Sequence, residues 1–568
     1  MTHAYERDKD IVYLNTLPLD EARQFIARER VKQAAWKFLL DFQPGQRCLV
    51  LEGGVGSASI ALSEHYQEIV LLQNNPSTPC LTQGWTNNIT VVCSSFFAAL
   101  PFTESTFDCV ILHDIGTLFA GRNETEATLL QSLLEAKRVL KSEGTLVVTG
   151  DNKSLFLWLR SKLKYLKAPA DEKKRLRGLP PPVTGLSHVD TMIRDMGFQH
   201  RSLFSMTPRL IPFQEVSRIG AGRAVQKWMR PAFMIIATQK SAPDSFLNRF
   251  SKIVLSHLGD VEIIRYISGN PDSVILIVRA EQRSGVERSA IVRLPLTKTS
   301  ATRCQRGVDA LQTLSGRRTV LSGLVPSVLG HGVFCDQPYF IESLIPGRVI
   351  ASPQPAALGR VVREAASLLT LFHQETAQPC FIDRTVFSRI SSPFISTILP
   401  HIKGSDAQKS FGYIMDVMRE RWLGVTLPLV FSHGDFQADN MILNPDTLRI
   451  QGVIDWDLSN DPALPLLDLL YLFLYAETML GRGHFEDIFM RQFFPLRLDN
   501  GTMTVIDNYC RAIGISSDDI LPLLIFFWLH HVAFRLERVW RQLDRWMDQS
   551  FYPILLKVYE TVRGEKAA

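Results

Sequence analysis

The stretch "FSHGDFQADNMILN", residues 431–444, is followed closely by "GVIDWDLSN", residues 452–460. Both pieces place oxygen-bearing side chains, Asp435, Asn440 and Asp455, among apolar residues. A carboxylate beside a hydroxyl can orient it and accept its proton, while amide and carboxylate oxygens are the hard ligands that Mg2+ prefers. The apolar neighbours predict strands and a core that hold these groups rigid. The two pieces therefore predict one site that combines a proton acceptor with ligands for a divalent cation.

The pattern H-G-D-x4-N followed by I-D-W-D resembles the aminoglycoside phosphotransferase and choline kinase family, which has a protein-kinase-like fold. The resemblance implies ATP and Mg2+ as cofactors and an acceptor hydroxyl as the target of phosphoryl transfer. Carried over by position, it makes Asp435 the catalytic residue that receives this hydroxyl and His433 a support of the catalytic loop. Asn440 and Asp455 would bind the metal, with Asp457 beside them.

The region before this site is predicted to form the small lobe of such a kinase. Two apolar runs joined by a polar turn predict an antiparallel strand pair, followed by a helix. Arg293 stands where many relatives have Lys to bind nucleotide phosphates, and Arg is always charged and can bind phosphate oxygens with two donors. Backbone groups from Glu342 to Leu344 would bind the adenine. The Glu that relatives carry on the next helix is not evident, and Gly307 stands near its place. In the helical lobe, Asp468 matches a residue that has a structural role in relatives.

The chain has 568 residues, which predicts two or more domains. A break containing Pro and Ser, "SAPDS" at residues 241–245, is the expected boundary. Residues 246–568 form the predicted kinase-like α+β domain, with a small lobe over 246–345 and a helical lobe over 346–568. Residues 1–241 form a separate α/β domain.

The first domain alternates short apolar runs with helical segments. Five strands are predicted by "RCLVLEGG", "EIVLLQ", "ITVVCSS", "FDCVILHD" and "EGTLVVTG", with helices at "SASIALSEHY" and "ATLLQSLLEAKRVLK". Such alternation predicts a parallel, doubly wound sheet. "FMIIATQK", residues 233–240, is predicted to be a late edge strand that closes this domain.

A glycine-rich turn follows the first of these strands. "VLEGGVGSAS", residues 50–59, places Glu52, Gly54 and Gly56 between a strand and a helix. Glycine there lets a ligand approach the backbone, and the helix offers free N–H groups. The turn resembles motif I of class I S-adenosylmethionine-dependent methyltransferases, and "ALPFTESTFDCVIL" and "EAKRVLKSEGTLVVTG" resemble two later signatures of that family. The resemblance covers about residues 30–240 and implies a Rossmann-like fold with S-adenosylmethionine as the cofactor.

The sequence departs from this family at two positions expected to contact the cofactor. Gln73 ends the second strand, where relatives carry Asp or Glu for the ribose hydroxyls. An amide gives up the charge-assisted hydrogen bond, which is roughly twice as strong as a neutral one. Ser95 follows the third strand, where relatives often carry Asp near the adenine. Two interpretations follow: a methyltransferase with altered cofactor binding, and a scaffold that resembles one.

A candidate base lies at the end of the fourth strand, where His113 and Asp114 face the substrate side of the family's sheet. Methyl transfer from a sulfonium mainly needs proximity and alignment, and it needs a base only for a weak hydroxyl acceptor. His113 is therefore either such a base or a buried structural residue.

The composition argues against some other classes of protein. The net charge of +5 is small for this length and does not favour a nucleic-acid binder. The 8 cysteines are scattered without a CxxC pair, which favours reduced thiols and a cytoplasmic protein. The N-terminus "MTHAYERDKDIVYL" lacks the apolar core of a signal peptide. The runs "PALPLLDLLYLFLY" and "LPLLIFFWLHHVAF" are shorter than a bilayer span, so we expect buried helices and no transmembrane segment.

Together these features predict a bifunctional enzyme: an ATP-dependent phosphotransferase acting on a hydroxyl of a small molecule or glycan, fused to an S-adenosylmethionine-dependent methyltransferase of the same pathway. The domain order is similar to that of enzymes that cap bacterial O-antigen chains with methyl phosphate. One alternative is a kinase whose first domain is a non-catalytic scaffold. Another is an antibiotic-modifying phosphotransferase, whose acceptor site would need acidic residues such as Asp461 and Glu477. The acceptor and the oligomeric state stay open.

Overall fold

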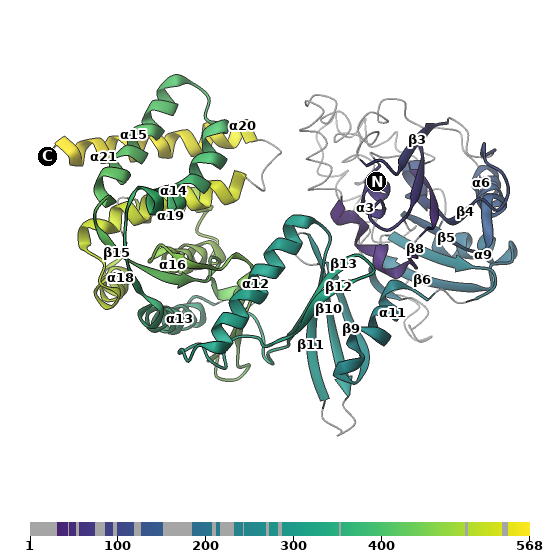
Figure 1. The fold of residues 1–568 in the computed structure, drawn as a ribbon, viewed down its shortest axis with the longest axis horizontal. Coiled ribbons are helices and arrows are strands. Elements are labelled where there is room, and N and C mark those ends of the chain that lie inside the picture. Colours follow the sequence, from purple (N-terminus) through teal and green to yellow (C-terminus); the bar gives the residue numbers. More distant parts are fainter. Residues whose placement is uncertain are drawn as a thin grey trace. The chain divides into compact units, whose positions relative to one another are not determined.

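The chain forms two compact units (Figure 1). One unit comprises Met1–Thr302 and Gly330–Ile341, and the other comprises Arg303–Leu329 and Glu342–Ala568. The strands of the predicted small lobe therefore group with the first domain, while the boundary near residues 241–245 stays a prediction. The computed structural model describes residues 31–43, 45–52, 56–73, 86–94, 99–118, 126–151, 185–206, 212–215, 232–241, 244–268, 272–281, 287–350, 354–494, 498–536 and 543–567.

The first unit contains an eight-stranded sheet with the order β3-β2-β1-β4-β5-β8-β6-β7. Strands β1 to β5 pair in parallel, which confirms the predicted doubly wound arrangement. The strand order reverses between β1 and β4, and ligands of such sheets bind at the carboxyl ends of the strands beside this point. The strands are β1 (Arg47–Glu52), β2 (Glu68–Gln73), β3 (Ile89–Cys93), β4 (Phe107–His113), β5 (Leu140–Asp151), β6 (His200–Met206), β7 (Pro212–Glu215) and β8 (Ala232–Thr238).

The predicted edge strand is in fact internal, because β8 lies between β5 and β6 and pairs antiparallel with both. All seven residues of β8 are buried. A strand covered on both faces is a continuous apolar run, and "AFMIIAT" has that pattern. Strands β6 and β7, which the sequence did not predict, extend the sheet beyond it, so the sheet is mixed rather than wholly parallel.

Helices pack on this sheet through apolar residues at helical spacing. Leu129, Leu133 and Ala136 of α6 share one core with Val189 and Ile193 of α9 and with the sheet. The described helical elements of this part are η2 (Val31–Leu39), α3 (Ser57–Leu62), α5 (Ile115–Leu118), α6 (Glu126–Val139) and α9 (Leu186–Asp195).

A second sheet of five strands follows, with the order β12-β13-β11-β10-β9. The expected antiparallel pair is β10 and β11, in which Arg293 lies opposite Ile275. The strands are β9 (Asp260–Ser268), β10 (Ser273–Glu281), β11 (Glu287–Pro295), β12 (Val328–Phe334) and β13 (Gln337–Ser343); the helices nearby are α11 (Phe246–Ile253), η5 (Leu255–Leu258) and α12 (Lys298–Gly316).

Helix α11 begins directly after the expected boundary and joins the two sheets of the first unit. The ring of Phe246 lies 5.3 Å from that of Phe38 in η2 and 5.4 Å from that of Phe334 in β12, measured between centroids. Phe250 in the same helix lies 5.2 Å from Tyr339 of β13. The small sheet is therefore packed against the first domain through a shared aromatic core.

Polar contacts cross the same junction. Arg249 of α11 forms an ion pair with Asp41 at 2.9 Å. The hydroxyl of Tyr266, on β9, donates to the carbonyl of Ala35 in η2. Both contacts link segments far apart in the sequence, which restricts the movement of the small sheet relative to the first domain.

The second unit is mostly helical, as predicted, and has one large core (Figure 1). It contains a three-stranded sheet, β14-β15-β18, and a hairpin of β16 and β17. Its elements are α13 (Pro355–Thr376), β14 (Gln378–Phe381), α14 (Arg384–Ile398), η6 (Leu399–His401), α15 (Ser405–Trp422), β15 (Thr426–Ser432), η7 (Ala438–Asn440), β16 (Met441–Leu443), β17 (Ile450–Val453), η8 (Trp456–Leu458), β18 (Asn460–Ala463), α16 (Leu467–Met479), α17 (Phe485–Ile488), η9 (Phe489–Phe493), α18 (Asn500–Ile513), η10 (Ser517–Asp519), α19 (Ile520–Leu536), α20 (Leu543–Trp546), η11 (Met547–Phe551) and α21 (Tyr552–Ala567).

The two long apolar runs form α16 and α19, which are buried as expected. The prediction that both are too short for a bilayer is wrong for the second, because Ser517–Leu536 has 20 residues and passes a length and composition test for a span. Among the described residues it alone does so, and 72% of its apolar window is buried inside the protein. Burial of this kind is what a core helix shows.

Candidate active sites

The loop that carries the predicted catalytic residue Asp435 follows β15 in the second unit and turns sharply at Gly434. The φ angle of Gly434 is +82°, and a Cβ there would lie 2.2 Å from the carbonyl oxygen of Leu458. Only glycine fits this turn without strain. The turn directs the chain from the buried strand into the loop that carries Asp435.

The carboxylate of Asp435 is held by two side-chain amides. Gln437 donates to its Oδ2 at 3.1 Å, and Asn440 donates to the same oxygen at 3.2 Å. The Asn440 nitrogen also donates to the Asp435 carbonyl at 2.9 Å. Because the nitrogen makes these bonds, the amide oxygen of Asn440 is the atom that can serve as a metal ligand.

The hairpin of β16 and β17 brings Asn440 and Asp455 to neighbouring positions. Asn440 directly precedes β16, Asp455 follows β17, and Met441 pairs with Val453. The backbone N–H of Ile454 donates to the Asn440 carbonyl at 3.0 Å. Asp455 itself has a φ angle of +69°, which is uncommon for a non-glycine residue and frequent at functional sites.

This pair of oxygen donors fits Mg2+. The ion is commonly bound by one or two carboxylates together with substrate phosphates and water, rather than by a complete protein cage. In the part of the chain that the structure describes, no group of three or more His, Cys, Asp or Glu residues could hold a metal by itself. The donor set at Asn440 and Asp455 therefore suits a nucleotide-bound cation.

His433 is buried and acts within the loop in its neutral form. Its Nε2 lies 3.0 Å from the carbonyl oxygen of Ile454, and its Nδ1 accepts the backbone N–H of Asp435 at 3.3 Å. These partners place the ring proton on Nε2. Burial lowers the pKa of His433 despite the nearby charges of Asp468 and Asp455. The geometry matches a supporting role for the loop.

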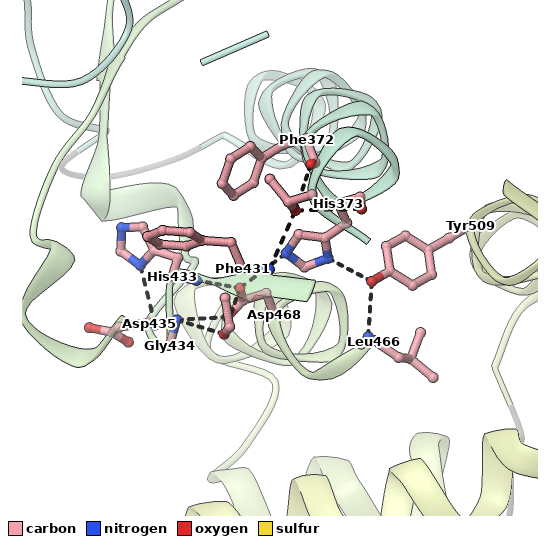
Figure 2. Close-up of polar contacts among 11 residues, drawn as sticks. Phe372, His373, Phe431, His433, Gly434, Asp435, Leu466, Asp468 and Tyr509 are labelled. Atoms are coloured by element: carbon pink, nitrogen blue, oxygen red, sulfur yellow. Dashed lines mark hydrogen bonds and ion pairs between the residues drawn. The ribbon is translucent and has the colours of Figure 1, made fainter. Parts of the chain in front are cut away.

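Asp468, near the start of α16, receives the hydrogen bonds that fix this loop (Figure 2). Its carboxylate accepts from the Ser432 hydroxyl at 3.0 Å and from the backbone N–H groups of His433 and Gly434 at 2.7 and 2.9 Å. Burial raises the pKa of Asp468, but the contact with His373 and these hydrogen bonds outweigh it, so the pKa lies below its ordinary value. Asp468 is thus a charged structural anchor.

A steric contact explains why α12 carries Gly307 near the position where relatives have Glu. A Cβ on Gly307 would lie 2.7 Å from Oδ1 of Asp457. Helix α12 therefore approaches the segment after Asp455 so closely that a side chain at position 307 would require the Asp457 carboxylate to move. This glycine allows the Asp457 carboxylate to lie directly against the helix.

The predicted nucleotide-binding residues lie partly in the other unit. Arg293 is on β11 of the first unit, whereas Glu342 and Leu344 belong to the second, at the end of β13 and just beyond it. The structure brings together Asp435, Asn440, His433 and Asp455, but the convergence of the remaining residues on one nucleotide stays a prediction.

The carboxylates considered for an aminoglycoside site have protein partners. Asp461 forms an ion pair with Arg317 at 3.1 Å. Glu477 pairs with Arg482 at 2.7 Å and accepts from Gln492 at 3.0 Å. Their negative charge is balanced locally, which weakens the case for a strongly acidic acceptor surface.

A second candidate site lies at the carboxyl ends of the parallel strands in the first unit. Glu52 ends β1 and pairs in register with His113 at the end of β4, and Gln73 ends β2. All three side chains are buried. Gly56 precedes α3 with a φ angle of 78°, so the turn needs glycine there. Gly54 and Ser95 lie outside the described residues.

His113 is held by a threonine rather than left open to solvent. Thr149 Oγ1 accepts the backbone N–H of Asp114 at 2.8 Å and lies 3.2 Å from Nδ1 of His113. The indole of Trp36, in η2, lies 5.7 Å from the imidazole between ring centroids. No local pattern singles out Trp36, because it precedes the first strand and belongs to no motif.

The sequence patterns also did not identify His373 and Tyr509, which contact each other beside the loop that carries Asp435. They are 136 residues apart and lie on helices whose apolar pattern only indicates a core. No local motif marks either residue.

Comparison with known proteins agrees with the predicted family of the second domain. Residues 276–498 match the family model APH, described as the phosphotransferase enzyme family. Acyl-CoA dehydrogenase family member 11 from Gallus gallus is 36% identical over 118 residues, which cover 19% of this chain and 14% of that protein. Its counterpart from Homo sapiens is 32% identical over 103 residues, covering 17% of this chain and 11% of that protein. The chain thus spans a small part of the length of these relatives.

Solved structures similar to each half were also found. An aminoglycoside phosphotransferase from Streptomyces rimosus, in complex with ADP and streptomycin, has 17% identity and a TM-score of 0.32. The match covers 51% of this chain and 98% of that one. A methyltransferase from Thermotoga maritima has 17% identity and a TM-score of 0.27, covering 42% of this chain and 100% of that one. At these values the fold assignment depends on the topology of the sheets and on the family match.

Proposed function

We propose that this chain is a bifunctional transferase: an ATP-dependent phosphotransferase that acts on a hydroxyl of a small molecule or glycan, and an S-adenosylmethionine-dependent methyltransferase. The observation that carries the proposal is the loop in which Asp435 lies beside Asn440, with Asp455 on the neighbouring strand end. The family match over residues 276–498 supports the phosphotransferase. The doubly wound sheet with Glu52 and His113 at its switch point supports the methyltransferase.

In the phosphotransferase, Asp435 orients the acceptor hydroxyl and accepts its proton as the phosphoryl group is transferred. The amides of Gln437 and Asn440 bind the carboxylate and keep it aligned with the acceptor. Asn440 and Asp455 would hold Mg2+, which would supply neutralisation of the charge on the nucleotide phosphates. Such positioning and neutralisation account for most of the catalysis of phosphoryl transfer.

In the methyltransferase, Glu52 and Gln73 bind the cofactor at the ends of β1 and β2. His113 is buried and engaged with Thr149, which suits a residue that shapes the site better than one that exchanges protons with solvent. An acceptor that is already anionic needs no base. We therefore propose that the methyl acceptor is the phosphate introduced by the kinase, so that phosphorylation comes first.

This order has a direct test. The pathway acceptor is incubated with S-adenosylmethionine, with and without ATP, and the products are followed by mass spectrometry. The proposal expects a methylated phosphate product that requires ATP. Equal methylation without ATP would show two independent activities on one chain.

A kinase with a scaffolding first domain is the second candidate, and the neutral Gln73 favours it because a charged partner for the ribose is missing. An antibiotic-modifying enzyme is less well supported, since Asp461 and Glu477 already have cationic partners. We place the bifunctional enzyme in the cytoplasm, acting on small-molecule or glycan acceptors without nucleic acid.

Calorimetry on the full chain separates the two candidates. Mg-ATP and S-adenosylmethionine are titrated separately into the protein. The bifunctional enzyme binds both ligands. Binding of Mg-ATP alone would favour the scaffold, and binding of neither by folded protein would contradict both proposals.

A further inference from the structure

A buried tyrosine on α18 reaches the anchor of the catalytic loop through one histidine (Figure 2). Tyr509 is completely buried, and its hydroxyl accepts the backbone N–H of Leu466 at 3.0 Å. The same hydroxyl lies 2.6 Å from Nδ1 of His373, on α13. On its other side, Nε2 of His373 lies 3.5 Å from Oδ2 of Asp468.

The hydrogen positions in this chain of contacts follow from its donors and acceptors. Leu466 can only donate, so the Tyr509 oxygen must accept. The phenolic hydrogen then finds an acceptor at Nδ1 of His373, which places the ring proton on Nε2, facing Asp468. The opposite tautomer would turn a lone pair toward the carboxylate and leave the buried phenolic hydrogen without this acceptor, which is costly.

The contact between His373 and Asp468 is long for a hydrogen bond, so its effect is mainly electrostatic. It nevertheless acts on the residue that fixes the loop, because the Asp468 carboxylate accepts from Ser432, His433 and Gly434. A rotation of this carboxylate would release the peptide units that precede Asp435.

We propose that Tyr509 is a positioning residue for phosphoryl transfer: its hydroxyl fixes the tautomer of His373 and thereby the orientation of Asp468. Helix α18, far from the loop in sequence, then controls the placement of Asp435. This inference rests on the proposed phosphotransferase function. It assigns no contact with substrate to Tyr509.

The test compares Tyr509→Phe with Tyr552→Phe in the full chain. Each change removes a phenol oxygen that accepts a backbone N–H, from Leu466 in one case and from Lys403, at 2.8 Å, in the other. Hydrolysis of Mg-ATP is measured at varied nucleotide concentration. Tyr509→Phe is expected to lower kcat by roughly 10- to 100-fold, the effect of a slight misplacement of a catalytic group, with little change in KM, while Tyr552→Phe leaves kcat unchanged.

A second measurement separates positioning from simple loss of stability. His373→Gln is combined with Tyr509→Phe, and the losses in kcat are expected to be far from additive, because both changes act through one contact. Unchanged kcat in folded Tyr509→Phe protein, or additive losses in the double variant, would overturn the proposal.

A spectroscopic readout distinguishes failure of this inference from failure of the proposed function. Nitrogen-15 NMR of labelled histidine reports the tautomer without any turnover. The wild-type protein is expected to show His373 protonated at Nε2, and Tyr509→Phe is expected to alter that signal. The other tautomer in the wild type would contradict the inference, whereas the expected tautomer in a protein that neither binds nor hydrolyses Mg-ATP would contradict only the phosphotransferase.

Discussion

The backbone N–H of His433 donates to the carboxylate of Asp468 at 2.7 Å inside the second unit. Asp468 lies on α16, 35 residues after His433, and it also accepts the N–H of Gly434. One buried carboxylate therefore fixes two successive peptide units just before Asp435. The position of the proposed catalytic group depends on helix packing as well as on its own loop.

The close approach of α12 to Asp457 predicts an unusual response to alanine. Replacing a helical glycine by alanine normally stabilises a protein by up to about 1 kcal/mol. Gly307→Ala should instead give no such gain and lower the free energy of unfolding by roughly 1 kcal/mol, because the new Cβ would force Oδ1 of Asp457 out of its position. Urea-induced unfolding measures the change.

Gly412, within α15, is the matched control, since a Cβ there meets no atom within 4 Å. Gly412→Ala should stabilise the protein. Equal stabilisation by Gly307→Ala and Gly412→Ala would contradict the close contact between α12 and Asp457.

Glu486 predicts a pH dependence of stability. Burial raises its pKa, but the contact with His531, whose Nε2 lies 3.7 Å from Oε1, and the hydrogen bond from Trp546 at 2.8 Å outweigh this effect and lower the pKa from 4.5 to about 2. A depressed carboxylate pKa contributes stability that is fully present above the unfolded pKa and is lost as the pH falls through the folded value. The contribution should therefore disappear between pH 4.5 and about 2.

Urea-induced unfolding of the wild type and Glu486→Gln measures this effect. At neutral pH the variant should be less stable by about 1–3 kcal/mol, the cost of weakening a partly buried hydrogen-bonded charge. The difference should shrink as the solution is acidified. Glu560→Gln, at a side chain that is 56% exposed, is the control and should show little difference at any pH. If the stability difference between the wild type and Glu486→Gln grew on acidification, the lowered pKa of Glu486 would be contradicted.

Gln73→Glu tests the cofactor site of the first unit. Gln73 is buried at the end of β2, so a carboxylate there costs stability in the free protein but gains charge-assisted hydrogen bonds to ribose hydroxyls. We expect affinity for S-adenosylmethionine to rise by about 10-fold, measured by calorimetry. Gln199→Glu, on the exposed surface of the same domain, should leave the affinity unchanged. Weaker binding in Gln73→Glu would mean that this side chain does not face the ribose.

Local patterns in the sequence predicted much of this architecture. The strands β1 to β5 follow from short apolar runs between helices, and the proximity of Asp435, Asn440 and Asp455 follows from residues close together in the chain. The position of β8 was wrong because an apolar run indicates burial but does not identify the neighbouring strands. The roles of Tyr509 and His373 depend on contacts between distant helices, which no local pattern reveals.

The sequence patterns also did not predict that the small sheet groups with the first domain. The prediction divided the chain near residues 241–245, where Pro and Ser suggest a break. The structure shows α11 directly after this break, with Phe246 and Phe250 packed between η2 and the small sheet, and the boundary itself stays a prediction. The hydrophobic pattern of one short helix indicates an apolar face but not which surfaces it covers.

Turnover by Asp435→Asn tests the central claim most directly. The variant keeps the size of the side chain and removes the carboxylate that would accept the acceptor proton. Transfer or hydrolysis of the γ-phosphate of Mg-ATP should fall by about 1,000-fold or more while nucleotide affinity stays nearly constant, a loss confined to the transition state. Asp406→Asn, at a side chain that is 96% exposed, should retain full turnover. Full turnover by a folded Asp435→Asn protein would contradict the assignment of this loop as the phosphotransferase active site.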